Sequence, residues 1–129
     1  MTEGRSVPGM TDAAAARKLS GPPRGEMSLA AVLAALSDPV RLEIVCMLAR
    51  GPERTCGSLG LPIAKSTLAH HLKVLREAGV IVQRPVGTSR MMCLRKKDLD
   101  ARFPGLLDSV LTAARKRRSR QYASKRALL

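Results

Sequence analysis

The sequence predicts a mainly α-helical fold with one small β-hairpin, made of about five helices and a two-stranded extension. Four stretches carry apolar residues at helical spacing: 28–36, 39–50, 66–78 and 98–114. After Gly79 the pattern changes, because 80–84 is rich in β-branched residues and 89–95 follows it across a turn. The expected architecture is a small helical domain with a hairpin directly behind one of its helices.

The length of the chain, 129 residues, suits one compact domain with tails. Of these residues 45% are hydrophobic, so a core can form. That core must be aliphatic, because Phe103 and Tyr122 are the only Phe, Tyr or Trp residues. Composition divides the chain into a flexible N-terminal arm (1–26) rich in Gly and Pro, a folded domain (27–114) and a basic tail (115–129).

Net charge is the strongest signal in the composition. Twenty-three Lys and Arg residues outnumber ten Asp and Glu residues, which gives +13. Such a balance indicates a polyanionic partner, either nucleic acid or an anionic membrane surface. No membrane span is expected, because the longest apolar run, 29–36, is too short to cross a bilayer. Three widely spaced cysteines, Cys46, Cys56 and Cys93, fit a reducing compartment, so we expect a cytoplasmic protein.

The first two helices each have a start signal. Ser28 can cap the helix over 29–36, and Asp38 can cap the next helix with Pro39 at its first position. That second helix is expected to end near Arg50, before a Gly-Pro pair. The Asp-Pro pair therefore separates two helices.

A helix-turn-helix is expected between residues 55 and 79. Residues 55–60 form a short helix at best, and 61–64 form a tight turn into the helix over 66–78. Leu68, Leu72 and Leu75 line one side of that helix, while its other side is slim and polar. Such a helix fits the DNA major groove, although an ordinary packed surface helix has the same pattern.

The hairpin over 80–95 has the position of a wing, because it follows directly behind the candidate reading helix. Arg84 and Arg90 bracket its tip and are placed to reach phosphates or the minor groove. Solvated edge charges that discourage aggregation are an equally good interpretation of the two arginines taken alone.

The last helical region, 98–114, carries a broad apolar face, and Pro104 starts its main part. The first helix, 29–36, is also apolar, and together the two offer more apolar surface than one small core needs. We therefore expect a twofold homodimer through the first and last helices. Packing of the last helix onto its own domain is the alternative.

Two segments resemble the ArsR family of bacterial winged-helix repressors in their residues, order and spacing. They are Ala35-Leu36-Ser37-Asp38-Pro39-Val40-Arg41-Leu42 and Ser66-Thr67-Leu68-Ala69-His70-His71-Leu72-Lys73-Val74-Leu75-Arg76-Glu77-Ala78-Gly79. The resemblance covers roughly 29–111 and leaves both tails outside. It implies a winged helix-turn-helix fold and a dimeric transcription factor, usually a repressor, that binds a palindromic operator. Many members release DNA when they bind an inducer.

The resemblance assigns DNA reading to the helix that follows the tight turn. The expected DNA contacts are Lys65, Ser66, Thr67, Ala69, His70 and Lys73 in this helix, with Arg84 and Arg90 in the wing. Ala69 stands where the family often has Ser. Ala64 stands where the family often has a capping Ser, which weakens the helix start by about 1 kcal/mol unless Ser66 or Thr67 caps it. His71 points about 100° away from His70, so it is expected to serve packing and hydrogen bonding inside the domain.

No metal site and no cofactor are expected. Many family members sense metal through a C-x-C pair or through Asp and His in the last helix. Here Cys56 lacks a second thiol nearby, and the last helix has Asp108 but no His. Cys56, near Arg54, is a candidate thiol switch, with an inert cysteine as the favoured alternative. The inducer is therefore an unknown small molecule, a redox signal, or absent.

The expected function is sequence-specific binding of a double-stranded DNA operator by a dimeric transcriptional regulator, acting as a repressor and associated with the nucleoid when bound. The alternative is a sequence-indifferent basic protein that shapes DNA or binds RNA through charge. Scarce aromatic residues argue against stacking on single strands. An enzyme is not expected, because the sequence lacks the motifs of serine hydrolases, P-loop proteins, dinucleotide enzymes and zinc proteases.

Overall fold

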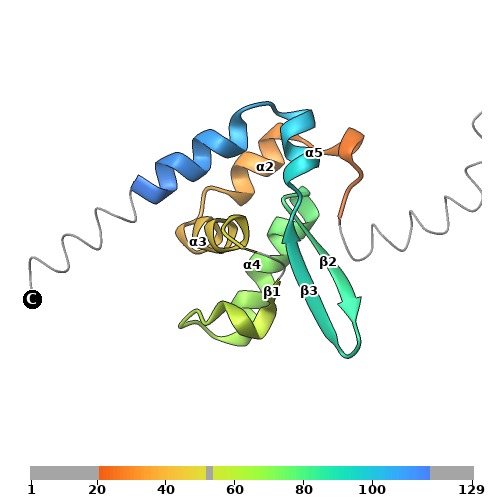
Figure 1. Ribbon diagram of the computed structural model, residues 1–129, viewed down its shortest axis with the longest axis vertical. Coiled ribbons are helices and arrows are strands. Elements are labelled where there is room, and N and C mark those ends of the chain that lie inside the picture. Colours follow the sequence, from red (N-terminus) through yellow and green to blue (C-terminus); the bar gives the residue numbers. More distant parts are fainter. Residues whose placement is uncertain (1–20, 52–53, 117–129) are drawn as a thin grey trace, which may run out of the picture.

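The computed structural model describes residues 21–51 and 54–116, with the side chain of Cys56 left out (Figure 1). Residues 1–20 of the expected arm and 117–129 of the expected tail lie outside the described residues. The elements, with η for a 3-10 helix, are η1 (Arg24–Glu26), α2 (Leu29–Ala35), α3 (Pro39–Ala49), β1 (Arg54–Thr55), η2 (Cys56–Leu59), α4 (Lys65–Ala78), β2 (Ile81–Val86), β3 (Ser89–Leu94), α5 (Lys96–Arg102) and a last helix over 106–116. Among the described helices, none has the length and apolar character that a bilayer crossing needs.

Helices α2 and α3 begin where the sequence predicted. The Ser28 hydroxyl accepts one backbone N–H of α2 at 3.3 Å. Asp38 Oδ2 accepts the N–H groups of Val40 at 2.8 Å and Arg41 at 3.1 Å. Pro39 occupies the first turn of α3, where its missing N–H removes no helical hydrogen bond. Both predicted caps are confirmed, and the short helix expected over 55–60 is η2.

Helix α4 has no side-chain cap at its N-terminus and ends at a C-terminal glycine, Gly79. Ala64 precedes it in an extended conformation, without a side-chain cap for the first N–H groups. At the other end Gly79 is left-handed with φ of 91°, and its N–H donates to the Arg76 carbonyl at 3.0 Å. A Cβ on Gly79 would also lie 3.0 Å from the Met27 side chain. Glycine is therefore needed here for both backbone conformation and close packing.

The hairpin belongs to a three-stranded antiparallel sheet with strand order β1-β3-β2. Strand β2 pairs with β3 along its whole length, and a two-residue turn at Gly87 and Thr88 joins them. Gly87 has φ of 62°, the left-handed conformation that tight hairpin turns require. The expected two-stranded wing is present. Strand β1 adds a third strand that the sequence analysis missed, by pairing Arg54 with Met92.

The core is aliphatic and joins the helices to the sheet. Its largest fully buried side chains are Met27, Val32, Ile44, Val45, Leu75, Val80, Ile81, Met92 and Leu107. Phe103 packs against this cluster and remains half-buried. Because the cluster includes residues of both α4 and the sheet, α4 and the hairpin are held by one common core.

Residues 21–27, here called the N-terminal strap, lie against the domain. Met27 is 1% exposed. Arg95 Nη1 donates to the Pro22 carbonyl at 2.6 Å, and Arg102 Nε donates to the Met27 carbonyl at 3.2 Å. The sequence analysis assigned residues 21–26 to a flexible arm. In the structure their contacts hold them to α5 and to the C-terminal end of α4.

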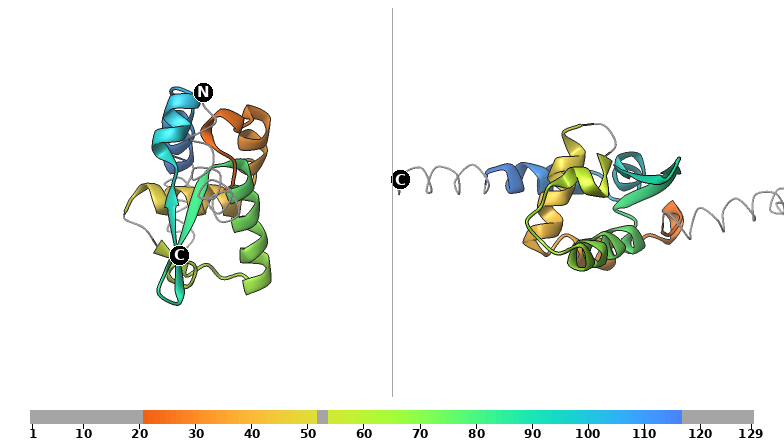
Figure 2. Two further views of the ribbon diagram at one scale, coloured as in Figure 1. Left: turned by 90° about the vertical axis from the view of Figure 1, so that its right-hand side faces the viewer. Right: turned by 90° about the horizontal axis from the view of Figure 1, so that it is seen from below.

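The last helical region consists of two helices. The chain turns at 103–105 after α5 and then continues as the helix over 106–116. Leu107 and Leu111 of this last helix are buried, so one side of it packs on the domain's own core. Figures 1 and 2 show that α2, α5 and the last helix gather at the end of the molecule opposite the hairpin tip.

Candidate nucleic-acid interface

The outward side of α4 carries the helix residues that the sequence analysis assigned to DNA contacts. All six are exposed: Lys65, Ser66, Thr67, Ala69, His70 and Lys73. The opposite side of α4 is packed on the core through buried Leu72, Leu75 and Ala78. The first turn of α4 has no acidic residue. The helix therefore presents short polar and basic groups at its positive end, which suits contact with an anion.

The hairpin stands beside α4. In the left view of Figure 2, the N-terminal end of α4 and the hairpin tip both lie at the lower end of the molecule, and Figure 1 agrees. Arg84 and Arg90 are exposed near that tip. One end of the molecule thus brings together the exposed side of α4 and both wing arginines.

Strand register places Arg84 and Arg90 on opposite faces of the hairpin. Side chains alternate along a strand, and directly paired residues share a face. Arg90 shares its face with Met92, which pairs with Gln83. Gln83 is buried and accepts a hydrogen bond from Arg76 of α4 at 3.1 Å, so this face looks toward α4. Arg84 lies on the other face, which means that the two arginines cannot contact one phosphate together.

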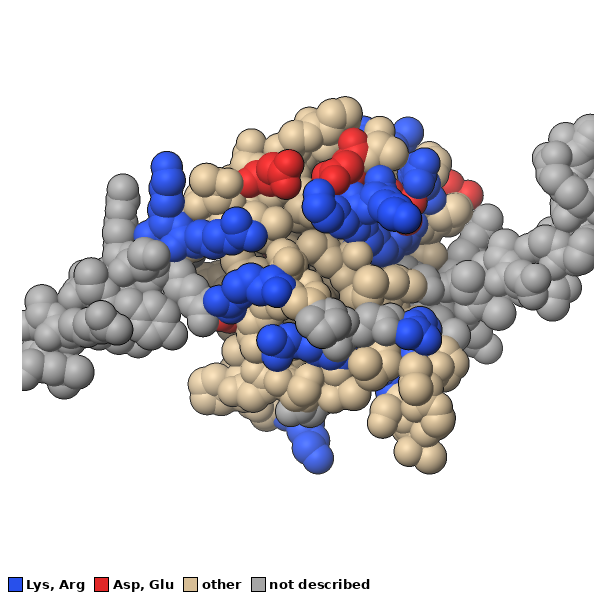
Figure 3. Space-filling model, in the orientation of Figure 1, with Lys and Arg blue, Asp and Glu red and all other residues tan. Residues whose placement is uncertain are grey.

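Positive charge is concentrated in this part of the chain. Residues 54–95 contain seven basic residues and one acidic residue, Glu77, for a net charge of +6. Residues 115–129 contain seven basic residues and no acidic one. On the face shown in Figure 3, acidic side chains gather near α5, while basic side chains also extend toward the hairpin end. The exposed Lys65, Arg84 and Arg90 lie at the end of the molecule that carries the start of α4 and the wing, and their charge favours a polyanion there.

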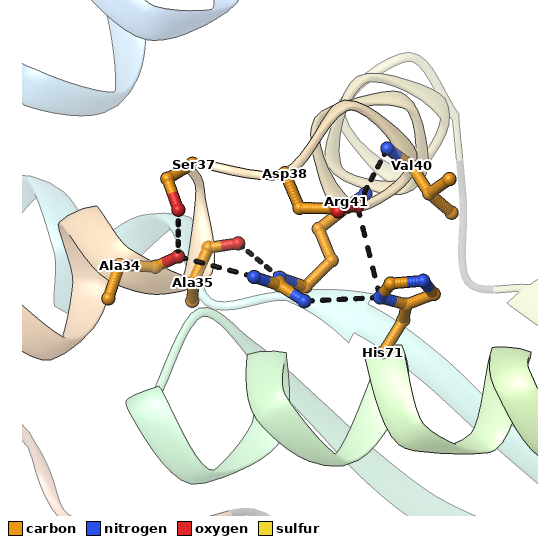
Figure 4. A network of polar contacts seen from close by, with 7 residues as sticks. All are labelled: Ala34, Ala35, Ser37, Asp38, Val40, Arg41 and His71. Atoms are coloured by element: carbon orange, nitrogen blue, oxygen red, sulfur yellow. Dashed lines mark hydrogen bonds and ion pairs between the residues drawn. The ribbon is translucent and has the colours of Figure 1, made fainter.

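His71 faces inward, as its expected role inside the domain requires (Figure 4). Its side chain is 12% exposed, and its Nδ1 lies 3.1 Å from Arg41 Nη1 and 3.9 Å from Asp38 Oδ2. Arg41 also donates from Nε to the Ala35 carbonyl at 2.6 Å and from Nη2 to the Ala34 carbonyl at 3.3 Å. The sequence motif that contains Arg41 does not by itself indicate this role.

Asp38 completes this network as an ionised carboxylate. Burial alone would raise the pKa of Asp38, but hydrogen bonds from the backbone N–H groups of Arg41 and Val40, together with nearby positive charge, outweigh it. The net effect holds the pKa of Asp38 below its ordinary value of 3.8. Asp38 therefore stays negative at the N-terminal end of α3 over the whole range in which histidines titrate.

The cysteines offer little chemistry in the part of the chain that the structure describes. Cys46 is buried in α3 and Cys93 is half-buried in β3, and neither forms a disulfide among the described residues. The Cys56 side chain, the candidate thiol switch, lies outside the described residues. Within 21–51 and 54–116, no three His, Cys, Asp or Glu side chains come together as a potential metal site.

Comparison with known proteins gives one consistent family. Residues 38–82 match the family described as bacterial regulatory protein, arsR family. The Bacillus subtilis protein named uncharacterized HTH-type transcriptional regulator YceK is 36% identical over 84 residues, which cover 63% of this chain and 84% of that protein.

Solved structures agree on the fold. An ArsR-like transcriptional regulator from Rhodococcus sp. RHA1 superposes with a TM-score of 0.52 at 27% identity, covering 78% of this chain and 91% of that one. The transcriptional repressor BigR from Xylella fastidiosa gives a TM-score of 0.52 at 33% identity, covering 66% of this chain and 84% of that one. These neighbours agree with the winged helix architecture that the sequence predicted.

Proposed function

The chain belongs to the arsR family of bacterial regulatory proteins, whose members are DNA-binding transcriptional regulators, and from this premise we propose how it acts. It works as a dimeric repressor that places α4 in the major groove of an operator. The wing contacts the flanking backbone or the minor groove. Repression, rather than activation, is supported by the similarity to the transcriptional repressor BigR from Xylella fastidiosa.

The single observation that carries this proposal is the exposed, slim side of α4 within a basic segment. A major groove admits one α-helix, and short side chains let that helix approach the base edges closely. Ser66, Thr67 and His70 supply hydrogen-bonding groups for base edges, while Lys65 and Lys73 supply positive charge for phosphates. Ala69 supplies a methyl group that suits contact with thymine.

The wing arginines take separate tasks in this proposal. Arg90 lies on the hairpin face that looks toward α4, so it reaches the DNA segment that α4 occupies. Arg84 lies on the far face and reaches the next stretch of backbone or minor groove. Both tasks agree with the position of the hairpin tip beside the N-terminal end of α4 (Figure 2).

The proposed dimer forms at the opposite end of the molecule. Leu29 and Leu33 of α2 are 47% and 46% exposed, which is a large apolar surface for so short a helix. They lie at the end that also holds the last helix, 106–116. A twofold axis there would place two copies of α4 in successive major grooves, about 34 Å apart. An inducer, whether a small molecule or a redox signal at Cys56, would act by changing that spacing.

Competition between DNA sequences tests the proposal. Fragments bound by the protein are selected from random duplex DNA, and the affinity for the best fragment is divided by that for its scrambled version. We expect a ratio of at least about 10³, as specific regulators show. We also expect Lys73→Ala to weaken operator binding while Lys97→Ala does not, because each removes one exposed positive charge but only Lys73 lies on α4.

The charge of +13 also favours a second candidate, sequence-indifferent binding of nucleic acid. In that case the ratio would stay near one, and Lys73→Ala and Lys97→Ala would weaken binding equally. That outcome would overturn the regulator proposal in its specific form.

A further inference from the structure

The contact between Arg41 and His71 depends on the protonation state of the histidine. A guanidinium group has only donors, so it makes a hydrogen bond with His71 Nδ1 only when that nitrogen carries no proton. The geometry thus requires a neutral imidazole with its proton on Nε2. The same guanidinium donates hydrogen bonds to the Ala34 and Ala35 carbonyls at the end of α2. Arg41 therefore links the end of α2 to the middle of α4 (Figure 4).

We propose that His71 is a positioning residue for DNA reading, held by Arg41 when neutral and released when protonated, so that operator discrimination falls at acidic pH. The inference rests on the proposed function of α4. His71 itself faces the domain and contacts no DNA in this scheme.

The position of His71 explains why its hydrogen bond matters for reading. His71 directly follows the exposed His70 and lies two residues before the exposed Lys73, on the inward side of the same turns of α4. Hydrogen bonds to base edges tolerate only a few tenths of an ångström, so a small tilt of α4 misplaces all of them together. Leu72 and Leu75 are buried independently of this contact, so in this scheme α4 tilts while its apolar side stays packed on the core.

The charged groups around His71 set the direction of the effect. Asp38 and Arg41 of the α3 segment face His71, and on α4 itself the His70 ring centroid lies 6.0 Å away. Helix α2 (Leu29–Ala35) packs against α4 and carries no titratable side chain. A proton on Nδ1 removes the acceptor for Arg41, brings two cations together and leaves Asp38 as the attractive partner. His71 is then drawn from the Arg41 guanidinium toward the start of α3.

Total DNA affinity is the wrong readout, because protonated histidines also attract phosphates. Acidification adds positive charge to the protein as a whole, which strengthens binding to any duplex. Loss of α4 positioning acts in the opposite sense and only on the operator. The informative quantity is therefore the ratio of operator affinity to scrambled-duplex affinity.

The experiment measures this ratio between about pH 8 and about pH 5.5, a range that spans ordinary histidine titration. It compares the full-length wild-type chain with His71→Asn and His71→Leu. The Asn side-chain oxygen stands close to the place of Nδ1 and accepts from Arg41 without taking up a proton. The Leu side chain has similar bulk and no acceptor. Circular dichroism and the unfolding midpoint of each chain are recorded at each pH.

We expect the wild-type ratio to fall about tenfold on acidification, the size of one hydrogen bond. In His71→Asn the affinity ratio should equal that of the wild type at about pH 8, at both about pH 8 and about pH 5.5. In His71→Leu the ratio should be reduced at both pH values. His70→Asn still shows the wild-type loss, which separates the two neighbouring histidines. If His71→Leu does not fold, the comparison of His71→Asn with wild type decides alone.

Two failures are distinguishable. A wild-type ratio near one at pH 8 overturns the proposed function itself. A wild-type ratio well above one that is insensitive to pH, or that falls equally in His71→Asn, overturns the inference about His71 and leaves the proposed function standing. The nitrogen chemical shifts of His71 give an independent check, because a protonated Nδ1 at pH 8 would contradict the hydrogen bond from Arg41.

Discussion

Asp98 is the residue at which the N-terminal strap meets the base of the wing. Arg24 Nε of the strap donates to its Oδ1 at 2.8 Å, and Arg95 Nε, just after β3, donates to its Oδ2 at 3.0 Å. Burial alone would raise the pKa of Asp98, but the hydrogen bonds from Arg24 and Arg95 lower it below its ordinary value of 3.8. The ionised carboxylate therefore stabilises the folded chain.

Acid should remove this stabilisation. Because the folded-state pKa of Asp98 is lowered, its contribution is complete above the ordinary value of 3.8 and is lost as pH falls through the lower folded-state value. We expect Asp98→Asn to lower the free energy of unfolding by about 1–2 kcal/mol at neutral pH and by a smaller amount at a pH well below 3.8. Urea unfolding measures both values.

Asp108→Asn is the matched control, since the Asp108 side chain is 73% exposed and lies 4.0 Å from Lys96. We expect it to change the free energy of unfolding by less than about 0.5 kcal/mol. Equal effects of the two substitutions would show that the Asp98 contacts do not stabilise the fold.

The orientation of a single side chain could be predicted from the sequence, but its contact with a distant residue could not. The inward direction of His71 followed from helical periodicity, because neighbouring residues point about 100° apart. The link from Arg41 to His71 did not follow, because thirty residues separate the two in sequence and a long side chain reaches back over its own helix start. The Asp-Pro-Val-Arg motif was the available signal, but it gives no partner for the arginine.

At the scale of elements, sequence patterns predicted the helices and strands that are determined by residues within one segment. Helices α2, α3 and α4 and the hairpin follow from apolar spacing, caps and turn residues within each segment. Strand β1 has two residues, too few for any periodicity, and it exists because β3 offers a free edge for pairing. The composition of the strap resembles that of a Gly-Pro linker. Its ordered position could not be predicted from local sequence, because its contacts are made with residues more than fifty positions later.

Gly21 tests whether the strap is part of the fold. It has φ of 87°, and a Cβ there would lie 1.8 Å from the Arg76 carbonyl oxygen in α4. Gly21→Ala must therefore displace the strap, and we expect it to lower the free energy of unfolding by about 1–3 kcal/mol. Hydrogen exchange should also become faster at the C-terminal end of α4.

Gly25→Ala provides the control in the same strap. Nothing lies within 4 Å of a Cβ on Gly25. We expect this change to be neutral or slightly stabilising, because alanine restricts the unfolded chain. If Gly21→Ala proves as harmless as Gly25→Ala, the strap does not support α4.

At the scale of the whole molecule, two ends have different surfaces. One end holds α2, α5 and the last helix, with exposed leucines on α2. The other holds the start of α4 and the wing tip, within a segment of net charge +6. The net charge and the apolar faces could be predicted from the sequence. Their separation in space could not, because it depends on how all the elements pack together.

The basic tail adds a further prediction about overall charge. Residues 117–129 contain five basic and no acidic residues. We expect their removal to weaken binding to operator and scrambled duplex by the same factor, because phosphates attract charge without regard to sequence. The slope of log affinity against log salt should become shallower by up to about 4. A chain with the five residues changed to Gln separates charge from length, and an unchanged slope would remove the tail from DNA binding.

The central claim, that α4 reads base pairs, is tested most directly by a double-mutant cycle between His70→Ala and base-pair substitutions along the operator. We expect coupling of about 1–3 kcal/mol at one base pair in each half-site and none elsewhere, because one side chain reaches one or two base edges. Lys97→Ala should show no coupling at any position. If His70→Ala weakens binding to every operator variant and to scrambled DNA by one common factor, α4 does not read the sequence.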